Sequence, residues 1–249
     1  MKKMTQSEAV KLTIENLGGM ATLGLINQHV FEIKDCKWKT KTPPASIRRI
    51  VRHTKGIYRI KPGLYALESH RKELEANGFI VETAKNASSK AMETFTHAYY
   101  QGLLIEIGNM EGMGTFVPNQ DKNKHYTQKL TLGQMRSIQV MPHYSYQDLV
   151  KRSSTIDVIW FNERKMPSSF FEVEHSTDIQ NSLLKYVDLQ DFNVRMVIVA
   201  DEKRHEEFNK KIGETAFTDI AKRVHFLNYN SLLEQYDAEL KRNKQDFVL

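Results

Sequence analysis

The first 70 residues consist of short amphipathic stretches separated by turn signals. Thr5 and Glu8 have the spacing of a capping box, and the apolar positions after them keep a helical period until a glycine pair. Thr22 is expected to begin a second helix. Thr42-Pro43 supplies an N-cap and a proline at the first position of a third helix, residues 43–53. The pattern therefore predicts three short helices.

A hairpin is predicted directly after the third helix. Residues 56–60 and 64–67 are β-type runs on either side of a Lys61-Pro62-Gly63 turn. Three helices and a hairpin predict a winged helix-turn-helix domain over residues 1–70, whose third helix enters the major groove of DNA. Winged helices also serve as protein–protein modules, and that alternative stays open. Residues 71–88 are predicted to be a connector.

A long helix, about residues 89–109, is predicted to begin the second domain. Its apolar positions follow one stripe, and Glu106 falls inside that stripe. A carboxylate aimed at a core is unusual, so Glu106 is a candidate functional residue. The alternative is a buried glutamate that pairs with an arginine or caps a backbone group.

Two β-type runs, residues 156–161 and 169–174, contain acids within otherwise apolar sequence. The period of two places Asp157 on one face of the first run, and Glu172 and Glu174 together on one face of the second. The turn between the runs is short enough for a hairpin, so the three acids are expected to converge. An ordinary polar face of an exposed sheet is the alternative.

Converging carboxylates need a proton or a cation. Two bare carboxylates about 4 Å apart repel by roughly 4 kcal/mol at an effective dielectric near 20. Ligands that are all oxygen favour magnesium or manganese over zinc. The acids therefore predict a divalent-metal site.

The remaining pattern predicts a mixed α/β core. Helices are expected over residues 178–192, 201–212 and 231–242, and strands over 194–200 and 223–229. The predicted fold class is α/β (α+β): an N-terminal winged helix domain, then a mixed β-sheet flanked by helices over residues 89–249.

Composition restricts the compartment and the partners. No apolar run approaches the length of a membrane span, and the single cysteine, Cys36, rules out an internal disulfide. A cytoplasmic protein without membrane contact is expected. Residues 1–85 contain 16 Lys+Arg and 8 Asp+Glu, a charge of +8, whereas the whole chain carries +6, which leaves −2 for the rest. This asymmetry favours a polyanion, here double-stranded DNA.

The basic residues divide into two groups of candidate DNA contacts. Groove contacts are predicted from the third helix and phosphate contacts from its flanks. The groove set is Ser46, Arg48, Arg49 and Arg52, and the phosphate set is Lys37, Lys39, Lys41 and Arg59.

The acids also resemble a known motif. Asp157 and Glu172 stand fifteen positions apart, and Glu172-Val173-Glu174 ends the second run, which resembles the PD-(D/E)xK nuclease superfamily. Glu174 stands where most members have lysine, although some restriction endonucleases carry glutamate there. The N-terminal stretch SEAVKLTIENLGGMATLGLINQHVF resembles winged helices of the HARE-HTH type, which are found fused to some restriction endonucleases.

The resemblance implies a chemistry and a partner. Asp157, Glu172 and the carbonyl of Val173 would hold Mg²⁺, with Mn²⁺ as a substitute, and Glu174 would orient or deprotonate the attacking water. Glu106 would hold a second ion or a ligating water. The implied activity is that of a Mg²⁺-dependent, site-specific type II restriction endonuclease, acting as a homodimer on double-stranded DNA. No Walker-type loop is present in the sequence, so no nucleotide cofactor is expected.

Alternative functions remain at this stage. The glutamate at position 174 also fits a DNA-binding regulator whose nuclease fold is catalytically dead. A structure-specific or modification-dependent nuclease is a further alternative. Lys185, on the helix after the acids, is either a phosphate contact or a solvated lysine.

Overall fold

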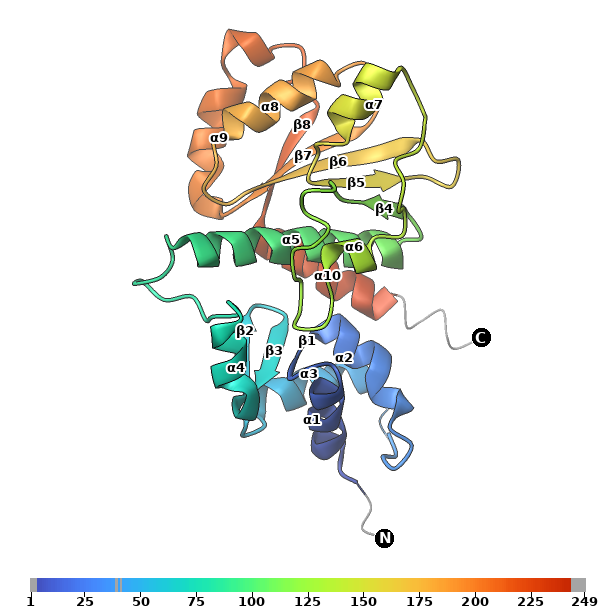
Figure 1. Ribbon diagram of the computed structural model, residues 1–249, viewed down its shortest axis with the longest axis vertical. Helices are drawn as coiled ribbons and strands as arrows, with labels where there is room; N and C mark the ends of the chain where they lie inside the picture. The colour runs from blue at the N-terminus through green and yellow to red at the C-terminus, as the bar shows by residue number, and fades with distance from the viewer. Residues whose placement is uncertain (1–3, 39, 41, 243–249) are drawn as a thin grey trace. The chain divides into compact units, whose positions relative to one another are not determined.

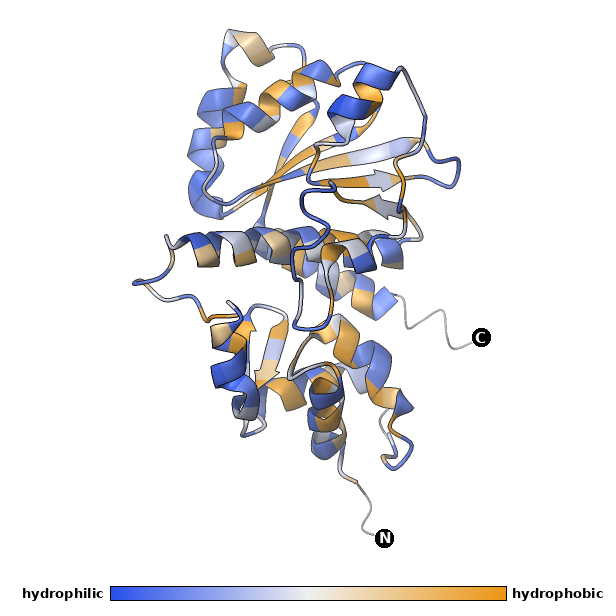
Figure 2. Cartoon of the chain, viewed as in Figure 1, coloured by the Kyte–Doolittle hydropathy of each residue, from blue (hydrophilic) through white to orange (hydrophobic). Residues whose placement is uncertain are grey.

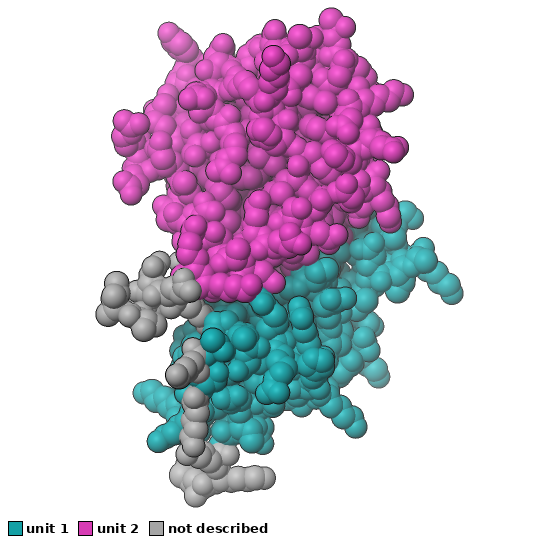
Figure 3. Space-filling model, turned by 180° about the vertical axis from the view of Figure 1, so that it is seen from behind, with its two compact units in different colours: residues 1–95, 127–130 teal, residues 96–126, 131–249 magenta. Residues whose placement is uncertain are grey.

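The computed structural model describes residues 4–38, 40 and 42–242, and it divides into two compact units (Figure 3). Unit 1 comprises residues 1–95 and 127–130, and unit 2 comprises residues 96–126 and 131–249. The division falls within a long helix. The domain boundaries drawn from the sequence, at residues 70 and 88, stay predictions.

Unit 1 contains short helices and a small antiparallel sheet (Figure 1). The strand order is β1-β3-β2, with both pairs antiparallel. Its elements are α1 (Gln6–Asn16), β1 (Met20–Thr22), α2 (Leu23–His29), the 3-10 turn η1 (Val30–Glu32), α3 (Pro43–His53), β2 (Ile57–Lys61), β3 (Leu64–Leu67), the 3-10 turn η2 (Glu68–His70) and α4 (Arg71–Ala76).

Local sequence explains most of unit 1. Thr5 and Glu8 form the predicted capping box, with the Thr5 N–H donating to the Glu8 carboxylate at 2.7 Å. The three predicted helices and the hairpin are confirmed. Thr42 occupies the N-cap of α3 without a side-chain hydrogen bond. Strand β1 was not predicted, because its three residues become a strand only through pairing with β3.

Unit 2 contains a five-stranded mixed sheet with helices on both faces. Helix α5, whose residues up to 95 belong to unit 1, leads into it, and α10 ends it. Its elements are α5 (Lys90–Met110), β4 (Gly114–Phe116), α6 (Leu132–Met135), α7 (Gln147–Ser153), β5 (Val158–Phe161), β6 (Pro167–Glu174), α8 (Ile179–Asp188), β7 (Arg195–Ala200), the 3-10 turn η3 (Glu202–Arg204), α9 (His205–Ile212), the 3-10 turn η4 (Thr215–Phe217), β8 (Val224–Asn228) and α10 (Tyr229–Arg242).

The sheet order β4-β5-β6-β7-β8 joins an antiparallel half to a parallel half. Strands β4, β5 and β6 run antiparallel, whereas β6, β7 and β8 pair in parallel. Helices α7, α8 and α9 cover one face, and α5 lies on the other (Figure 1). On the α5 face, Trp160 donates to the Leu104 carbonyl at 3.0 Å. On the opposite face, Tyr186 of α8 donates to the Val197 carbonyl at 2.7 Å.

The core of unit 2 follows the predicted apolar runs. Figure 2 shows hydrophobic residues along β5 and β7, and a largely hydrophilic α9. Strand β7 is buried from Met196 to Ala200, as expected for a strand covered on both faces. The structure also places two short helices, α6 and α7, between residues 126 and 152. Among the described residues, no helix is both long enough and apolar enough to cross a bilayer.

Candidate active site

Asp157 immediately precedes β5 and lies opposite Glu172 on β6. The hairpin register pairs Val158 with Phe171, so the next antiparallel pair outward is Asp157 with Glu172. The Val173 N–H donates to Asp157 Oδ2 at 2.8 Å and fixes the carboxylate at the end of the sheet. Both side chains are almost fully buried. The predicted hairpin and the convergence of these two acids are confirmed.

Glu172 is held by two side chains from α8. Lys185 Nζ lies 2.8 and 3.0 Å from the two carboxylate oxygens, and it also donates to the Thr155 carbonyl at 3.0 Å. Ser182, three residues earlier on the same helix face, donates to Glu172 at 3.0 Å. Lys185 is only 22% exposed, so the solvated-lysine alternative is wrong.

Glu174 continues the same face of β6 and shares Ser182 with Glu172. Ser182 contacts both carboxylates, and Thr177 contacts the second oxygen of Glu174. A hydroxyl has one hydrogen, so Ser182 cannot donate to two ionised carboxylates at once. The arrangement is fully satisfied when one of the two glutamates is protonated. We call Glu172, Glu174, Ser182 and Lys185 the Glu172 side of the site.

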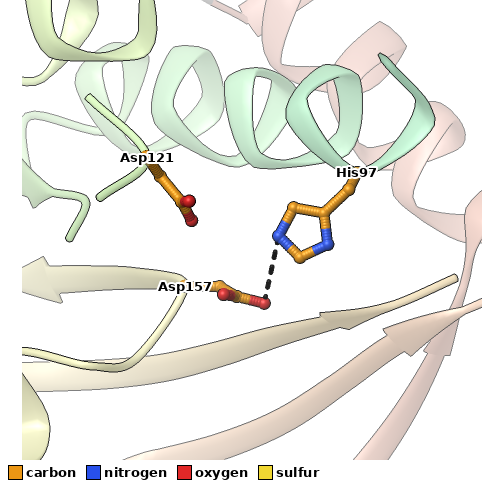
Figure 4. A group of neighbouring side chains, drawn as sticks. All are labelled: His97, Asp121 and Asp157. Carbon is orange, nitrogen blue, oxygen red and sulfur yellow. Dashed lines mark ion pairs between the residues drawn. The ribbon is translucent and has the colours of Figure 1, made fainter. Parts of the chain in front are cut away.

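Asp157 faces a second group, which comes from α5 and from the loop after β4. His97 Nε2 lies 3.5 Å from Asp157 Oδ2, and Asp121 completes a group of three (Figure 4). One ligand atom from each of the three residues lies within 4.8 Å of the other two. Gln101, one turn after His97, donates to Asp121 Oδ2 at 2.8 Å and to the Asp157 carbonyl at 3.2 Å. We call His97, Gln101 and Asp121 the His97 side.

The two sides differ in how completely their polar atoms are bonded. His97 Nε2 and Gln101 Oε1 are buried and have no hydrogen-bond partner among the described residues. The 3.5 Å contact from His97 to Asp157 is an ion pair without good hydrogen-bond geometry. Asp121 is paired with Lys124 at 2.6 Å.

Burial and neighbouring charges separate the acids by pKa. Burial alone would raise the pKa of Asp157, but His97 and the Val173 N–H outweigh it and hold that pKa below its usual value. Burial and the Asp157 charge raise the pKa of Glu172 well above its usual range, although Lys185 offsets part of the shift. Burial also raises the pKa of Glu174. Asp157 is therefore the acid that ionises most readily.

The neighbouring acids raise the pKa values of Lys185 and His97. Burial would lower the pKa of Lys185, but Glu172 outweighs it, so the pKa of Lys185 lies above its usual value. His97 behaves in the same way, with Asp157 as the partner that raises its pKa. Each cation thus stabilises one acid of the facing Asp157–Glu172 pair.

The structure does not bring Glu106 to this group. Glu106 accepts a hydrogen bond from Tyr126 at 2.8 Å. Nine residues separate it from His97 on α5, which places the two side chains on opposite sides of the helix at about 100° per residue. His97 and Gln101, not Glu106, are the α5 residues beside Asp157. The role of Glu106 as a ligand stays a prediction that this placement does not favour.

The candidate DNA contacts lie in unit 1 and are unequally exposed. Arg49, Arg52 and Arg59 are exposed, as is Lys37, whereas Ser46 and Arg48 are half-buried. Lys39 and Lys41 lie outside the described residues. Not every basic residue of unit 1 is exposed, because Lys61 is buried against Glu82 and the ring of Phe95.

Comparison with known proteins places the second part of the chain. Residues 80–248 match the model of the type II restriction enzyme NmeDI C-terminal domain family. The chain belongs to this family. The type II restriction enzyme NmeDI of Neisseria meningitidis serogroup C is 26% identical over 155 residues, which cover 59% of this chain and 44% of that enzyme. The chain thus aligns with less than half of this relative. No solved structure matches.

The NmeDI_C match includes both sides of the site. Asp157, the Glu172 side and the His97 side all fall within residues 80–248, whereas α1, α2 and α3 fall outside. Sequence reasoning found the β5–β6 acids but gave no role to His97, Gln101 or Asp121. The one signal in the sequence is that His97 and Gln101 form an i, i+4 pair of polar residues on a helix that is otherwise apolar on most sides.

Proposed function

We propose that this chain is a Mg²⁺-dependent, site-specific endonuclease of type II restriction character that hydrolyses phosphodiester bonds of double-stranded DNA. The observation that carries the proposal is the facing pair Asp157–Glu172, with Lys185 at hydrogen-bond distance from both oxygens of Glu172. The family match and the name of the relative support the same class of activity.

The donor set fits a divalent cation. Asp157 is buried with a lowered pKa, and it faces a second carboxylate across one strand pair. Asp157, Glu172 and the carbonyl of Val173 would hold the ion, an all-oxygen set suited to Mg²⁺ or Mn²⁺. The bound ion supplies Lewis acidity toward the phosphate and acidifies water.

Lys185 supports a PD-(D/E)xK assignment despite Glu174. Most members of that superfamily have a lysine two residues after the second acid, and here the ammonium comes from α8 instead. Lys185 stabilises the charge on Glu172 and supplies the positive charge that Glu174 does not. Glu174, whose pKa is raised, would accept and hold a proton from the attacking water.

Unit 1 is proposed to bind the DNA as a winged helix-turn-helix domain of HARE-HTH type. Its order of three helices followed by the β2–β3 hairpin supports this, as do the exposed Arg49 and Arg52 on α3. Cutting both strands of a duplex needs two centres, so the active form is proposed to be a homodimer.

A second candidate is a DNA-binding regulator with a catalytically dead nuclease fold. Lys185 already neutralises Glu172 by contacts to both carboxylate oxygens, so this pair is stable without an added ion. In that case the chain would bind a specific DNA site and cut it in no divalent metal.

Plasmid cleavage in Mg²⁺ tests the proposal. Asp157→Asn and Glu172→Gln should each lower the cleavage rate by at least about 100-fold, because loss of outer-shell partners of a metal alone costs about 10–100-fold. Asp191→Asn, an exposed acid just after α8, is the matched control and should cut like wild type. Cleavage by Asp157→Asn at the wild-type rate would overturn the assignment. Binding without cleavage by wild type would favour the regulator.

The salt dependence of DNA binding tests the role of unit 1. If about six phosphates are contacted, log K should fall against log salt with a slope of about −5. Replacement of an arginine that contacts phosphate, such as Arg59→Ala, should reduce that slope by about 1. Arg195→Ala, an exposed arginine of β7, is the control and should leave the slope unchanged. An affinity that does not change with salt would contradict the proposed binding of DNA phosphates by the basic residues of unit 1.

A further inference from the structure

The His97 side has the composition and the spacing of a metal site of its own. His97 comes from α5, Asp121 from the loop after β4, and Asp157 from the start of β5. Figure 4 shows the His97 ring facing the carboxylates of Asp121 and Asp157. Ligands of an octahedral ion at about 2.1 Å lie about 3 Å apart when cis and about 4 Å apart when trans. The three ligand atoms here lie within 4.8 Å of one another, so movements of less than about 1 Å by each side chain would bring them to those distances.

Unsatisfied polar atoms beside this group point to a ligand. His97 Nε2 has a lone pair or a proton without a good acceptor among the described residues. Gln101 is completely buried, and its Oε1 also has no described partner although its Nε2 is bonded to Asp121 and to the Asp157 carbonyl. Buried polar atoms without a partner destabilise a fold unless a ligand or water bonds to them. A hydrated cation would use the imidazole as ligand and the Gln101 carbonyl as acceptor for its water.

We propose that His97, Asp121 and Asp157 form a binding site for a divalent transition-metal ion, distinct from the Asp157–Glu172 site for Mg²⁺. An imidazole ligand favours Mn²⁺, Fe²⁺, Co²⁺ or Zn²⁺, whereas Mg²⁺ prefers oxygen alone. Two carboxylates balance the charge of the ion. The imidazole ligand therefore favours a transition-metal ion over Mg²⁺ at this site, and Mn²⁺ is the ion used to test it.

The proposal extends the proposed function, because both sites use Asp157 as a ligand. Asp157 lies between the two sides, so an ion on the His97 side would adjoin the nuclease centre. The competing account is a closed set of ion pairs, in which protonated His97 neutralises Asp157 and Lys124 neutralises Asp121. Lys124 is partly exposed and can leave Asp121, whereas Lys185 holds Glu172 from a largely buried position.

Titration of the full chain with Mn²⁺ in the absence of DNA decides between these accounts. Free Mn²⁺ is measured by its electron paramagnetic resonance signal, with Mg²⁺ present to occupy the Asp157–Glu172 site. Asp121→Asn and His97→Asn should each weaken Mn²⁺ binding by at least about tenfold, whereas Glu172→Gln should change it by less than about twofold. His143→Asn, an exposed histidine, is the matched control. Equal Mn²⁺ binding by His97→Asn and wild type would overturn the proposal.

A second measurement uses the unchanged protein and so does not depend on the folding of any variant. Pulsed resonance of bound Mn²⁺ should show coupling to an imidazole nitrogen. Coupling that is present in wild type and lost in His97→Asn supports the site. Bound Mn²⁺ without nitrogen coupling places the ion on oxygen ligands alone and overturns it.

Failure of this proposal and failure of the nuclease proposal give different results. If cleavage in Mg²⁺ requires Glu172 but Mn²⁺ binding ignores His97 and Asp121, the endonuclease stands and the second site is wrong. If Mn²⁺ binding requires His97 and Asp121 but no DNA is cut in any metal, the transition-metal site stands and the nuclease proposal fails.

Discussion

The two sides of Asp157 are equally polar but are satisfied in different ways. On the Glu172 side, the acids are bonded to Lys185, Ser182 and Thr177 from one helix and the turn before it. On the His97 side, two buried polar atoms lack partners among the described residues, and the contact to Asp157 is a 3.5 Å ion pair. The Glu172 side is thus compensated by side chains of the fold, whereas the His97 side leaves two buried polar atoms for which we propose a metal ion and its water as partners.

This difference has an energetic meaning. A buried acid is stable only with a partner, and removal of that partner leaves an uncompensated charge. The Glu172 side should therefore contribute strongly to folding, whereas the His97 side should contribute little to folding and more to ligand binding.

Lys185→Met should destabilise unit 2 by about 3 kcal/mol. The substitution leaves Glu172 buried beside Asp157 without its cation, and breaking a buried pair costs about 3–5 kcal/mol before discount for the partial exposure of Lys185. Urea unfolding would be followed by Trp160 fluorescence in a Trp38→Phe background, because the chain has only these two tryptophans.

Two controls accompany that measurement. Lys203→Met, at an exposed lysine, should stay within about 0.5 kcal/mol of wild type. Lys185→Met combined with Glu172→Gln should recover part of the lost stability, since the charge that needed compensation is gone. A cost below about 1 kcal/mol for Lys185→Met would show that the Glu172 side is not closed by this pair.

Ser182→Ala should destabilise unit 2 by about 1–2 kcal/mol. The substitution removes the hydroxyl between two buried carboxyls but leaves Lys185 on Glu172 and Thr177 on Glu174. The same unfolding experiment measures it, with the exposed Ser176→Ala as control. No change in stability would mean that the shared hydroxyl is dispensable to the pair of glutamates.

His97→Asn should cost less than about 1.5 kcal/mol in metal-free buffer. Its Nε2 makes only a long ion pair with Asp157, and the Val173 N–H still compensates that carboxylate after the substitution, so folding loses less than it does on the Glu172 side. The informative quantity is the ratio of this cost to that of Lys185→Met under identical conditions. If the two substitutions cost the same, the two sides of Asp157 are equivalent and the contrast fails.

The spacing of these residues along the chain explains why only the Glu172 side could be predicted from the sequence. Asp157, Glu172 and Glu174 belong to two neighbouring strands, where a period of two and a short turn fix their relative positions. His97, Asp121 and Asp157 lie 24 and 36 residues apart on three elements, so no local spacing connects them. Tertiary packing alone brings them together.

Helix α5 shows a second limit of local reasoning. The apolar stripe that contains Phe95, Tyr99 and Glu106 predicts the inner face of the helix, and Phe95 and Tyr99 are buried. The opposite face is buried as well, because Leu104 and Gly108 lie against Trp160 of β5. A helix covered on both sides has no single inner face, so the pattern selected Glu106 and overlooked His97.

The smallest effect is expected from a pair whose acid is exposed to solvent and which has no orphaned atoms, His70–Glu15 in unit 1. A hydrogen bond that the His70 ring donates to the Glu15 carboxylate at 2.9 Å raises the pKa of His70 above its usual value, against a smaller opposing effect of burial. Because the folded pKa lies above the unfolded one, the stabilisation is complete below the unfolded pKa of about 6.5 and is lost as pH rises through the folded value. Unit 1 should therefore lose at most about 1 kcal/mol of stability between pH 6 and pH 8.

Nuclear magnetic resonance titration of the His70 ring measures this pair directly. In wild type the midpoint should lie above that of a model histidine, and in Glu15→Gln it should move down toward that value, with the contact to Glu73 retaining part of the shift. The exposed His53 provides an internal reference in the same spectra. If Glu15→Gln leaves the midpoint of His70 unchanged, then Glu15 does not raise the pKa of His70. The buried pair Lys185–Glu172 would then differ from this pair in having any electrostatic coupling at all.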